Sequence, residues 1–225
     1  MEHPILFLDV ILGQFNLHIP PHVTYSWVVM LILLGLGMMA SRSISLVPKG
    51  AQNVFELVIG GLEEFMVEIT GEEGRAFFPY IATVFLYIMF CNLLGLLPGF
   101  LSPTSNINTT LSLALCTFAY THYLGVKYHG AKYIKHFLGP IPALAPLFLP
   151  IEIIGHVARV LSLTLRLFGN IMGEDLVLAI LLFLAGTFLA PLPMMFLAVF
   201  TSVVQAFVFT LLSMMYFAGS MEHAH

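Results

Sequence analysis

The stretch that decides the fold runs from Val157 to Leu184, VARVLSLTLRLFGNIMGEDLVLAILLFL, and it places charges inside an almost continuous apolar segment. Its charged residues are Arg159, Arg166, Glu174 and Asp175. A lone charge near the centre of a bilayer costs at least about 2.5 to 3.5 kcal/mol, so a membrane segment that keeps several charges indicates a use for them. Their meaning depends on whether the segment lies in a membrane.

The composition indicates an all-α, polytopic integral membrane protein. Hydrophobic residues make up 59% of the chain and charged residues 9%, with a mean hydropathy of +0.97, whereas soluble domains carry roughly a quarter charged residues. The net charge of −4 is too small to indicate a charged partner such as nucleic acid. Cys91 and Cys116 fall in apolar runs without metal-type spacing, so we expect ordinary packing and neither a disulfide, a metal site nor a cofactor.

Apolar runs of about 18 or more residues predict membrane spans near 24–41, 77–98 and 109–126. Between the first two, residues 50–70 predict an amphipathic helix on the membrane surface or against a partner, because apolar residues recur at helical spacing while four glutamates gather opposite. A solvated acidic face without a partner is the alternative. The N-terminal sequence MEHPILFLDV has acids where a signal peptide needs basic residues, so no cleaved targeting segment is expected.

The last two helices are predicted to form a long tilted hairpin. Four prolines are expected to prevent a helix before Pro150, and no proline follows until Pro191. A helix over 150–190 would be roughly 60 Å long, twice the hydrocarbon thickness of about 30 Å. It must break near Gly169 or Gly173 or lie strongly tilted, and the lack of a polar turn favours the tilt. The PLP at 191–193 predicts a tight turn into an antiparallel helix over 194–219, and residues 1–225 are expected to form one integral membrane domain.

The basic residues predict the topology. The loop after the first span holds Arg42, Lys49 and Arg75, the loop after the third holds Lys127, Lys132 and Lys135, and the 99–108 connection has none. By the positive-inside rule the two basic loops are cytoplasmic, which places the N-terminus outside and the C-terminus in the cytoplasm.

Polar residues share one face of the long helix. At 100° per residue, with Arg166 at zero, Arg159 falls at about 20°, Glu152 and Asn170 at about 40°, and His156 and Glu174 at about 80°, while Asp175 points roughly the opposite way. The last helix has a counterpart stripe of Thr201, Ser202, Gln205, Ser213 and Tyr216. For the serines and threonines we favour a role in joining the helices. For Gln205 a helix-joining role and a role in function stay equally open. For Arg166 we favour a role in function.

Two classes of function fit such a stripe: an ion pathway that works against a partner's moving charge, and a secondary transporter with a solute site at the midplane. Transporters of the second class usually show repeated halves and broken helices, and neither is visible in this sequence. A purely structural anchor leaves charges at this depth unexplained.

Four motifs resemble those of the a subunit of rotary F-type ATP synthases. SLTLRLFGN at 162–170 is the closest match, and FCNLLGLLPG at 90–99, PTSNINTTL at 103–111 and QAFVFTLL at 205–212 accompany it. The resemblance implies a non-catalytic stator subunit of the Fo sector in the bacterial inner membrane. Its implied partners are the c-subunit ring, the b-subunit stalk and the lipid bilayer, with no small-molecule substrate other than the transported ion.

The resemblance also implies a site and its mechanism. Protons would enter one aqueous half-channel, neutralise a carboxylate of the c ring, ride with it and leave by a second half-channel, with Arg166 as the essential arginine between them. Three positions depart from the family pattern: Asn106 stands where many relatives have Asp, Glu174 adds an acid, and Ala198 replaces a polar residue. Whether Glu174 or Asp175 is the weightier acid stays open, as does a sodium-translocating version. The candidate ion-translocating residues are Glu152, His156, Arg166, Asn170, Glu174, Asp175 and Gln205, with Arg159 as a supporting charge that neutralises a nearby acid.

Overall fold

The structure is a computed structural model that describes residues 19–42, 51–97, 99–130, 133, 145–185 and 191–221. All regular structure in these ranges is helical. In chain order the elements are α2 (Pro21–Arg42), α3 (Ala51–Thr70), η1 (Glu72–Ala76), α4 (Phe78–Leu94), η2 (Pro103–Ser105), α5 (Ile107–His129), α7 (Ala145–Ala185) and α8 (Pro191–Met221). The predicted all-α class is confirmed, while the expected N-terminal segment, Lys49, Lys132 and Lys135 lie outside the described residues. The tight turn predicted at 191–193 is wrong, because these residues already belong to α8.

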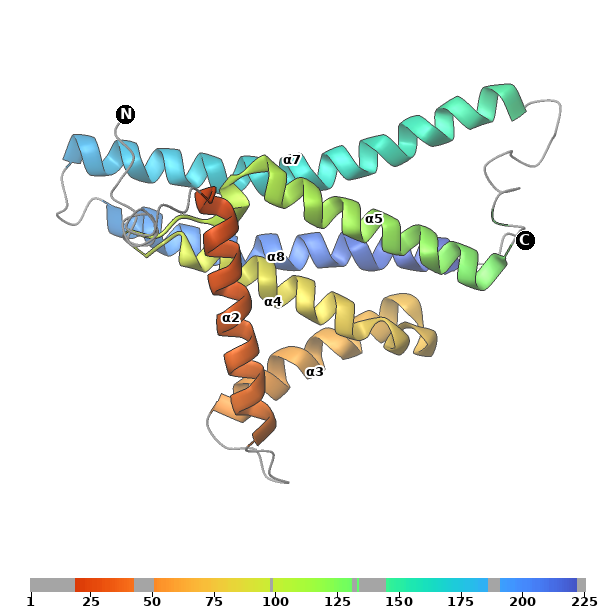
Figure 1. Cartoon of the computed structure of the whole chain (residues 1–225), viewed down its shortest axis with the longest axis horizontal. Coiled ribbons are helices and arrows are strands. Elements are labelled where there is room, and N and C mark those ends of the chain that lie inside the picture. The colour runs from red at the N-terminus through yellow and green to blue at the C-terminus, as the bar shows by residue number, and fades with distance from the viewer. Residues whose placement is uncertain are drawn as a thin grey trace.

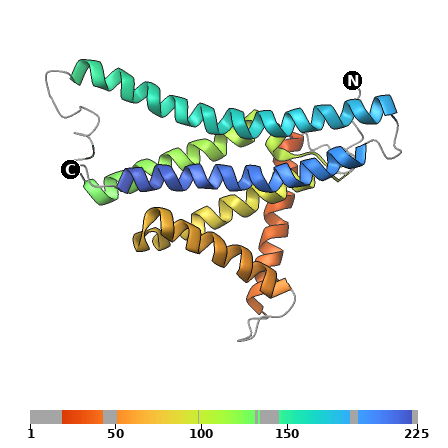
Figure 2. The same cartoon turned by 180° about the vertical axis from the view of Figure 1, so that it is seen from behind.

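The two longest helices form the predicted hairpin. α7 is a single helix of 41 residues, so the chain does not break at Gly169 or Gly173. It runs antiparallel to α8 in both views (Figures 1 and 2). Figure 1 shows α2 crossing the direction of α7 and α8 steeply. If α2 stands upright in the bilayer, the hairpin is therefore strongly inclined.

The prediction that prolines delay the long helix was wrong. α7 begins at Ala145 and contains Pro150, and α8 begins at Pro191 rather than at 194. Proline is tolerated in the first turn of a helix because the N–H groups there have no intrahelical partner to lose. Pro150 lies only five residues after Ala145, so it removes a single hydrogen bond close to the helix start.

The main core lies where α3, α4, α5, α7 and α8 meet. Its largest fully buried side chains include Met66, Phe77, Leu167, Phe209 and Phe217. The ring of Phe217 packs edge-on against Phe77, with centroids 5.4 Å apart. A smaller cluster that includes Tyr25, Val29 and Cys91 joins α2 to α4.

The amphipathic helix predicted over 50–70 is α3, and it packs against its own chain. Leu62 and Met66 are buried in the main core, and the Phe65 ring lies 5.4 Å from that of Phe207 on α8. The glutamates lie on the other side, where Glu63 forms an ion pair of 3.7 Å with Arg75. The C-terminal half of the apolar face is thus covered by α4 and α8, whereas Leu57 and Val58 stay exposed.

Three described helices are long and apolar enough to cross a membrane: Pro21–Met39, Pro150–Leu184 and Leu192–Met221, with Phe78–Leu94 shorter but apolar. Their outward faces expose large apolar side chains; Phe183 on α7 is 88% exposed, as expected for surfaces that meet lipid or a partner. The span predicted over 109–126 falls on the helix α5, which is less apolar than these helices, so its crossing of the membrane stays a prediction. Its buried Thr117 and Thr121 donate hydrogen bonds to carbonyls four residues earlier, which satisfies their hydroxyls inside the bundle.

The helix ends define two ends of the molecule. The start of α4 meets the end of α8 through Phe77 and Phe217, and the end of α5 joins it because His129 Nε2 lies 3.1 Å from the Ser220 carbonyl oxygen. Arg75 and Lys127 lie in these segments, so we call this the basic end. The opposite end holds η2, which packs against α2 and α7, and is called the η2 end.

Candidate functional site

Arg166 lies next to the midpoint of the apolar stretch Pro150–Leu184. Its half-buried guanidinium donates a hydrogen bond of 3.5 Å from Nη2 to Ser162 Oγ. Within the described ranges no carboxylate forms an ion pair with it. A guanidinium stays charged, so a permanent cation without an acid partner in these ranges lies near the middle of a long apolar helix. Such a charge needs water or a partner's anion to be stable there.

One turn further on, a hydrogen bond joins α7 to α8. Asn170 Nδ2 donates to Gln205 Oε1 over 2.6 Å. The Nε2 of Gln205 is buried and has no hydrogen-bond partner in the part of the chain that the structure describes. A buried donor without a partner costs about 1–3 kcal/mol, so a water molecule bound beside Gln205 would be stabilising.

The two adjacent acids face different elements. The Thr201 hydroxyl of α8 lies near the Glu174 carboxyl, whereas the Ser105 hydroxyl of η2 lies near the Asp175 carboxyl. Successive helical residues point about 100° apart, which explains the separate neighbours. Both carboxyls are half-buried and both partners are hydroxyls, which do not titrate in the physiological range.

A buried polar network holds η2 in place beside Asp175. Thr104 Oγ1 donates to Asn92 Oδ1 of α4 over 2.5 Å, and Asn92 Nδ2 donates to the Ser202 carbonyl of α8 over 3.4 Å. Ser102 Oγ lies 2.8 Å from Thr104 Oγ1. The sequence analysis assigned no role to Asn92, Ser102, Thr104 or Ser105. The sequence feature that could have identified these residues is the pair of motifs at 90–99 and 103–111, which lie side by side in the structure.

At the basic end, Glu152 and His156 form the expected neighbours on α7. Glu152 Oε1 lies 3.2 Å from His156 Nε2. The expectation that Arg159 neutralises an acid differs from the structure, because no ion pair within the described ranges includes Arg159. Its guanidinium carbon lies 5.5 Å from the centroid of the Tyr216 ring of α8, a geometry typical of cation–π contacts.

A cavity of about 300 Å³ opens beside these groups, and Tyr133, Glu152, His156, Arg159 and Tyr216 line it. A second space of about 10 Å³ shares His156, Arg159 and Tyr216 with it and reaches Leu163. A space of this size holds about one water molecule. Two neighbouring spaces of decreasing size therefore lie between the basic end and the turn of α7 that precedes Arg166.

Two residues beside this cavity were missed by sequence reasoning. His122 Nδ1 of α5 lies 2.8 Å from the Tyr133 hydroxyl, and the His122 and His156 rings lie 4.9 Å apart. Burial raises the pKa of the Tyr133 phenol, so its hydroxyl stays protonated at neutral pH. Gly125 has no side chain, and this lets the Tyr133 ring approach the backbone of α5. His122 lies inside the apolar run 109–126, which was interpreted only as a membrane span. The spacing of residues within α5 does not indicate which other helix packs against His122.

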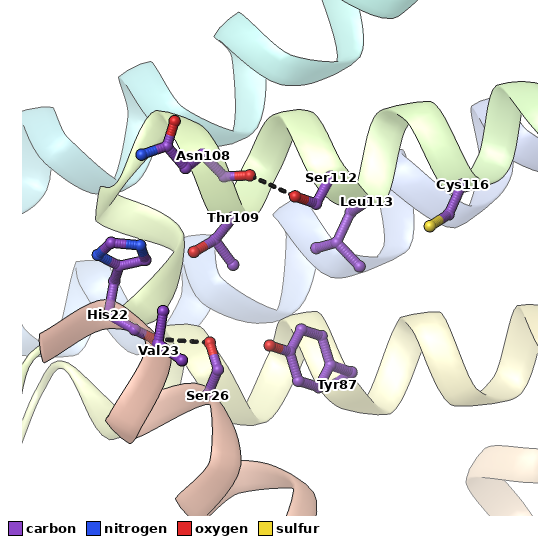
Figure 3. Close-up of a pocket in the computed structure, with 9 residues that line it drawn as sticks. All are labelled: His22, Val23, Ser26, Tyr87, Asn108, Thr109, Ser112, Leu113 and Cys116. Atoms are coloured by element: carbon purple, nitrogen blue, oxygen red, sulfur yellow. Dashed lines mark hydrogen bonds between the residues drawn. The ribbon is translucent and has the colours of Figure 1, made fainter. Parts of the chain in front are cut away.

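A separate cavity of about 300 Å³ lies near the η2 end between α2, α4 and α5 (Figure 3). His22, Tyr87, Asn108 and Cys116 are among its lining residues, and none of the predicted site residues is. Cys116 and Cys91 are both free thiols. No group of three metal-binding side chains occurs in the described segments.

Comparison with known proteins gives consistent matches along the chain. The sequence model of the family described as ATP synthase A chain matches residues 23–218. The chain is 61% identical to ATP synthase subunit a of Syntrophobacter fumaroxidans, 57% identical to that of Desulfosudis oleivorans and 52% identical to that of Citrifermentans bemidjiense. Each of these alignments covers 100% of both chains.

Proposed function

The chain belongs to the ATP synthase A chain family, and from this premise we propose that it carries protons past Arg166 between two half-channels as the stator subunit of the Fo sector. The observation that carries the proposal is the position of Arg166. It lies near the centre of the Pro150–Leu184 stretch, with titratable groups of the same helix towards both ends. In this role the chain performs no bond-making chemistry of its own.

Arg166 cannot relay a proton, because a guanidinium stays protonated under all working conditions. It can hold a carboxylate of a c-ring subunit in the charged form. At 4 Å and an effective dielectric near 20 the attraction is about 4 kcal/mol, or about three pKa units. One charge crossing roughly 150 mV gains about 3.5 kcal/mol. The arginine therefore attracts a carboxylate strongly enough to deprotonate it and weakly enough to release it.

The two half-channels lie on either side of this charge. The cavity beside Glu152 and His156 opens at the basic end, and the positive-inside rule places that end in the cytoplasm. Asp175 and Glu174 lie on the other side of Arg166, where Ser105 of η2 contacts Asp175. The basic end then holds the inner half-channel, and the C-terminus lies on the same, cytoplasmic side. The η2 end holds the outer half-channel, and the N-terminus lies on the same, outer side. The Asn170–Gln205 bond stands between them.

The coupling ion is the proton. An imidazole accepts H⁺ and has no use as a site for Na⁺, which prefers oxygen ligands, and His156 lines the basic-end cavity. Acids and histidines in series inside a membrane commonly form proton relays. The c ring packs on the outward face of α7 around Arg166, where Leu165 and Met172 are exposed, and the remaining outward faces meet lipid and the b-subunit stalk.

The test is the loss of Arg166. Arg166→Ala should abolish ATP-driven acidification of inverted membrane vesicles while the complex still assembles and its soluble part still hydrolyses ATP. Arg166→Lys should also fail badly, because an ammonium lacks the planar fork and can lose its proton when desolvated. Assembled complex is quantified in each preparation. Near-normal acidification by Arg166→Ala would overturn the proposal and favour a secondary transporter with a solute-binding arginine.

A further inference from the structure

Two histidines from different helices meet at the basic end. The ring centroids of His122 on α5 and His156 on α7 lie 4.9 Å apart, with the ring planes inclined by 63°. Phe118 packs edge-on against both rings, at 4.3 Å and 5.6 Å. From these contacts we infer that His122 and His156 act as one proton-collecting pair at the mouth of the inner half-channel. The inference rests on the proposed function and adds to it a residue of α5.

The hydrogen bonds of the pair suit both protonation states. Glu152 Oε1 lies 3.2 Å from His156 Nε2, and a carboxylate accepts from Nε2–H whether the ring is neutral or an imidazolium. The Tyr133 hydroxyl lies 2.8 Å from His122 Nδ1. A hydroxyl can donate to a bare ring nitrogen and accept from a protonated one. The pair therefore gains or loses a proton without leaving either of these partners unsatisfied.

The charges that face the pair limit it to one proton. Glu152 and Arg159 approach from α7, Tyr133 from the segment after α5, and Tyr216 of α8 holds the Arg159 guanidinium over its ring. The Glu152 carboxylate lies beside His156 Nε2, so a first proton on the pair has a negative charge close to it. A second would place two imidazolium rings and a guanidinium around one cavity, and like charges at this spacing oppose ionisation.

His156 places the pair beside two neighbouring spaces, and this position indicates what the pair does. His156 lines both the cavity of about 300 Å³ and the space of about 10 Å³ that follows it. A ring of the pair takes a proton from a water molecule in the wide cavity, and the imidazolium returns it to the water in the narrow space, with no other bond made or broken. When protons are scarce on the inner side, an imidazole that binds and releases a proton collects them faster than water alone. At acidic pH water supplies enough protons without the pair.

The experiment uses the whole complex in inverted membrane vesicles, in which the inner half-channel faces the medium. His122→Gln removes the titrating ring and keeps a polar side chain. We expect its ATP-driven acidification rate per complex to stay within about twofold of the parent at a medium pH of about 6.5 and to fall at least about fivefold below it at about 8.5. The ATP hydrolysis rate of the uncoupled soluble part is measured alongside.

His129→Gln is the matched control, because His129 also lies near the end of α5 and stacks on the Tyr133 ring, but its Nε2 lies beside the Ser220 carbonyl. It should follow the parent at both pH values. A second variant, His122→Ala, should regain part of its lost rate at high pH when imidazole is added to the medium.

A His122→Gln rate that parallels the parent, or that falls by the same factor at every pH, would overturn the inference and leave His122 as a packing residue. This failure is distinguishable from failure of the proposed function. If only the inference about His122 fails, Arg166→Ala still abolishes acidification. If the proposed function fails, Arg166→Ala leaves acidification near normal.

Discussion

Asp175 and Glu152 are both acids of α7, but the two ends of the helix surround them differently. At the η2 end Asp175 meets the Ser105 hydroxyl, and its neighbour Glu174 meets the Thr201 hydroxyl. At the basic end Glu152 lies beside His156, and His122 lies against His156 in turn. Among the described contacts of these acids, those at the η2 end have only hydroxyl partners, whereas at the basic end several titrating groups can share a proton. Removal of one acid should cost more where no other kind of titrating group stands beside it.

The largest effect is expected at Asp175, on which this contrast depends most. Asp175→Asn keeps the volume and a polar group beside Ser105 but removes the only titrating group in that contact. ATP-driven acidification of inverted vesicles should fall by about tenfold or more at unchanged assembly, as for the loss of a proton-transfer group. Glu174→Gln should lower it by only about twofold, since Glu174 is the acid that the family pattern does not require. The reverse order would exchange the roles of the two acids.

A smaller effect is expected at Glu152. Glu152→Gln keeps an oxygen that accepts from His156 Nε2 but removes the negative charge that favours the imidazolium. Because His122, His156 and water remain, acidification should fall by roughly threefold, and the deficit should grow as the medium pH rises. Glu64→Gln on the exposed side of α3 is the control and should match the parent. A loss at Glu152 as large as that at Asp175 would show that the basic end has no redundancy.

The smallest effect is expected at Arg159, whose guanidinium lies over Tyr216. Arg159→Leu removes a cation–π contact worth about 0.5 to 2 kcal/mol, so the amount of assembled complex should fall by about twofold while acidification per complex changes little. Immunoblots of the complex in membranes measure the first quantity and vesicle acidification the second. Arg159→Lys keeps a cation over the ring and should restore most of the assembly. Abolished acidification with normal assembly would instead place Arg159 in the ion path.

The helices could be predicted from the sequence because each signal lies within one segment. Length and apolar composition locate α2, α4, α7 and α8, and the glutamate spacing identifies α3. The starts of α7 and α8 were misplaced because proline was treated as a helix breaker, although the first turn tolerates it. η1 was missed because its five residues are too few to show a periodic pattern.

The site could be predicted only along α7. The 100° spacing places Glu152, His156, Arg166 and Asn170 on one face, and the contact of Asn170 with Gln205 confirms that the stripes of α7 and α8 meet. The partners from other elements, such as Ser105 and His122, could not be found. Periodicity on one helix carries no information about which residues of another helix pack against it.

The length of α7 also bears on how the protein responds to membranes of different thickness. The 35-residue apolar stretch Pro150–Leu184 is about 52 Å long and must incline by about 55° from the membrane normal to fit a hydrocarbon layer of about 30 Å. A helix at this inclination adapts to a change of 1 Å in the thickness of the hydrocarbon layer by rotating only about 1.3° about its centre. Arg166 lies next to that centre, so thicker or thinner lipid moves the ends of α7 while the central charge keeps its depth.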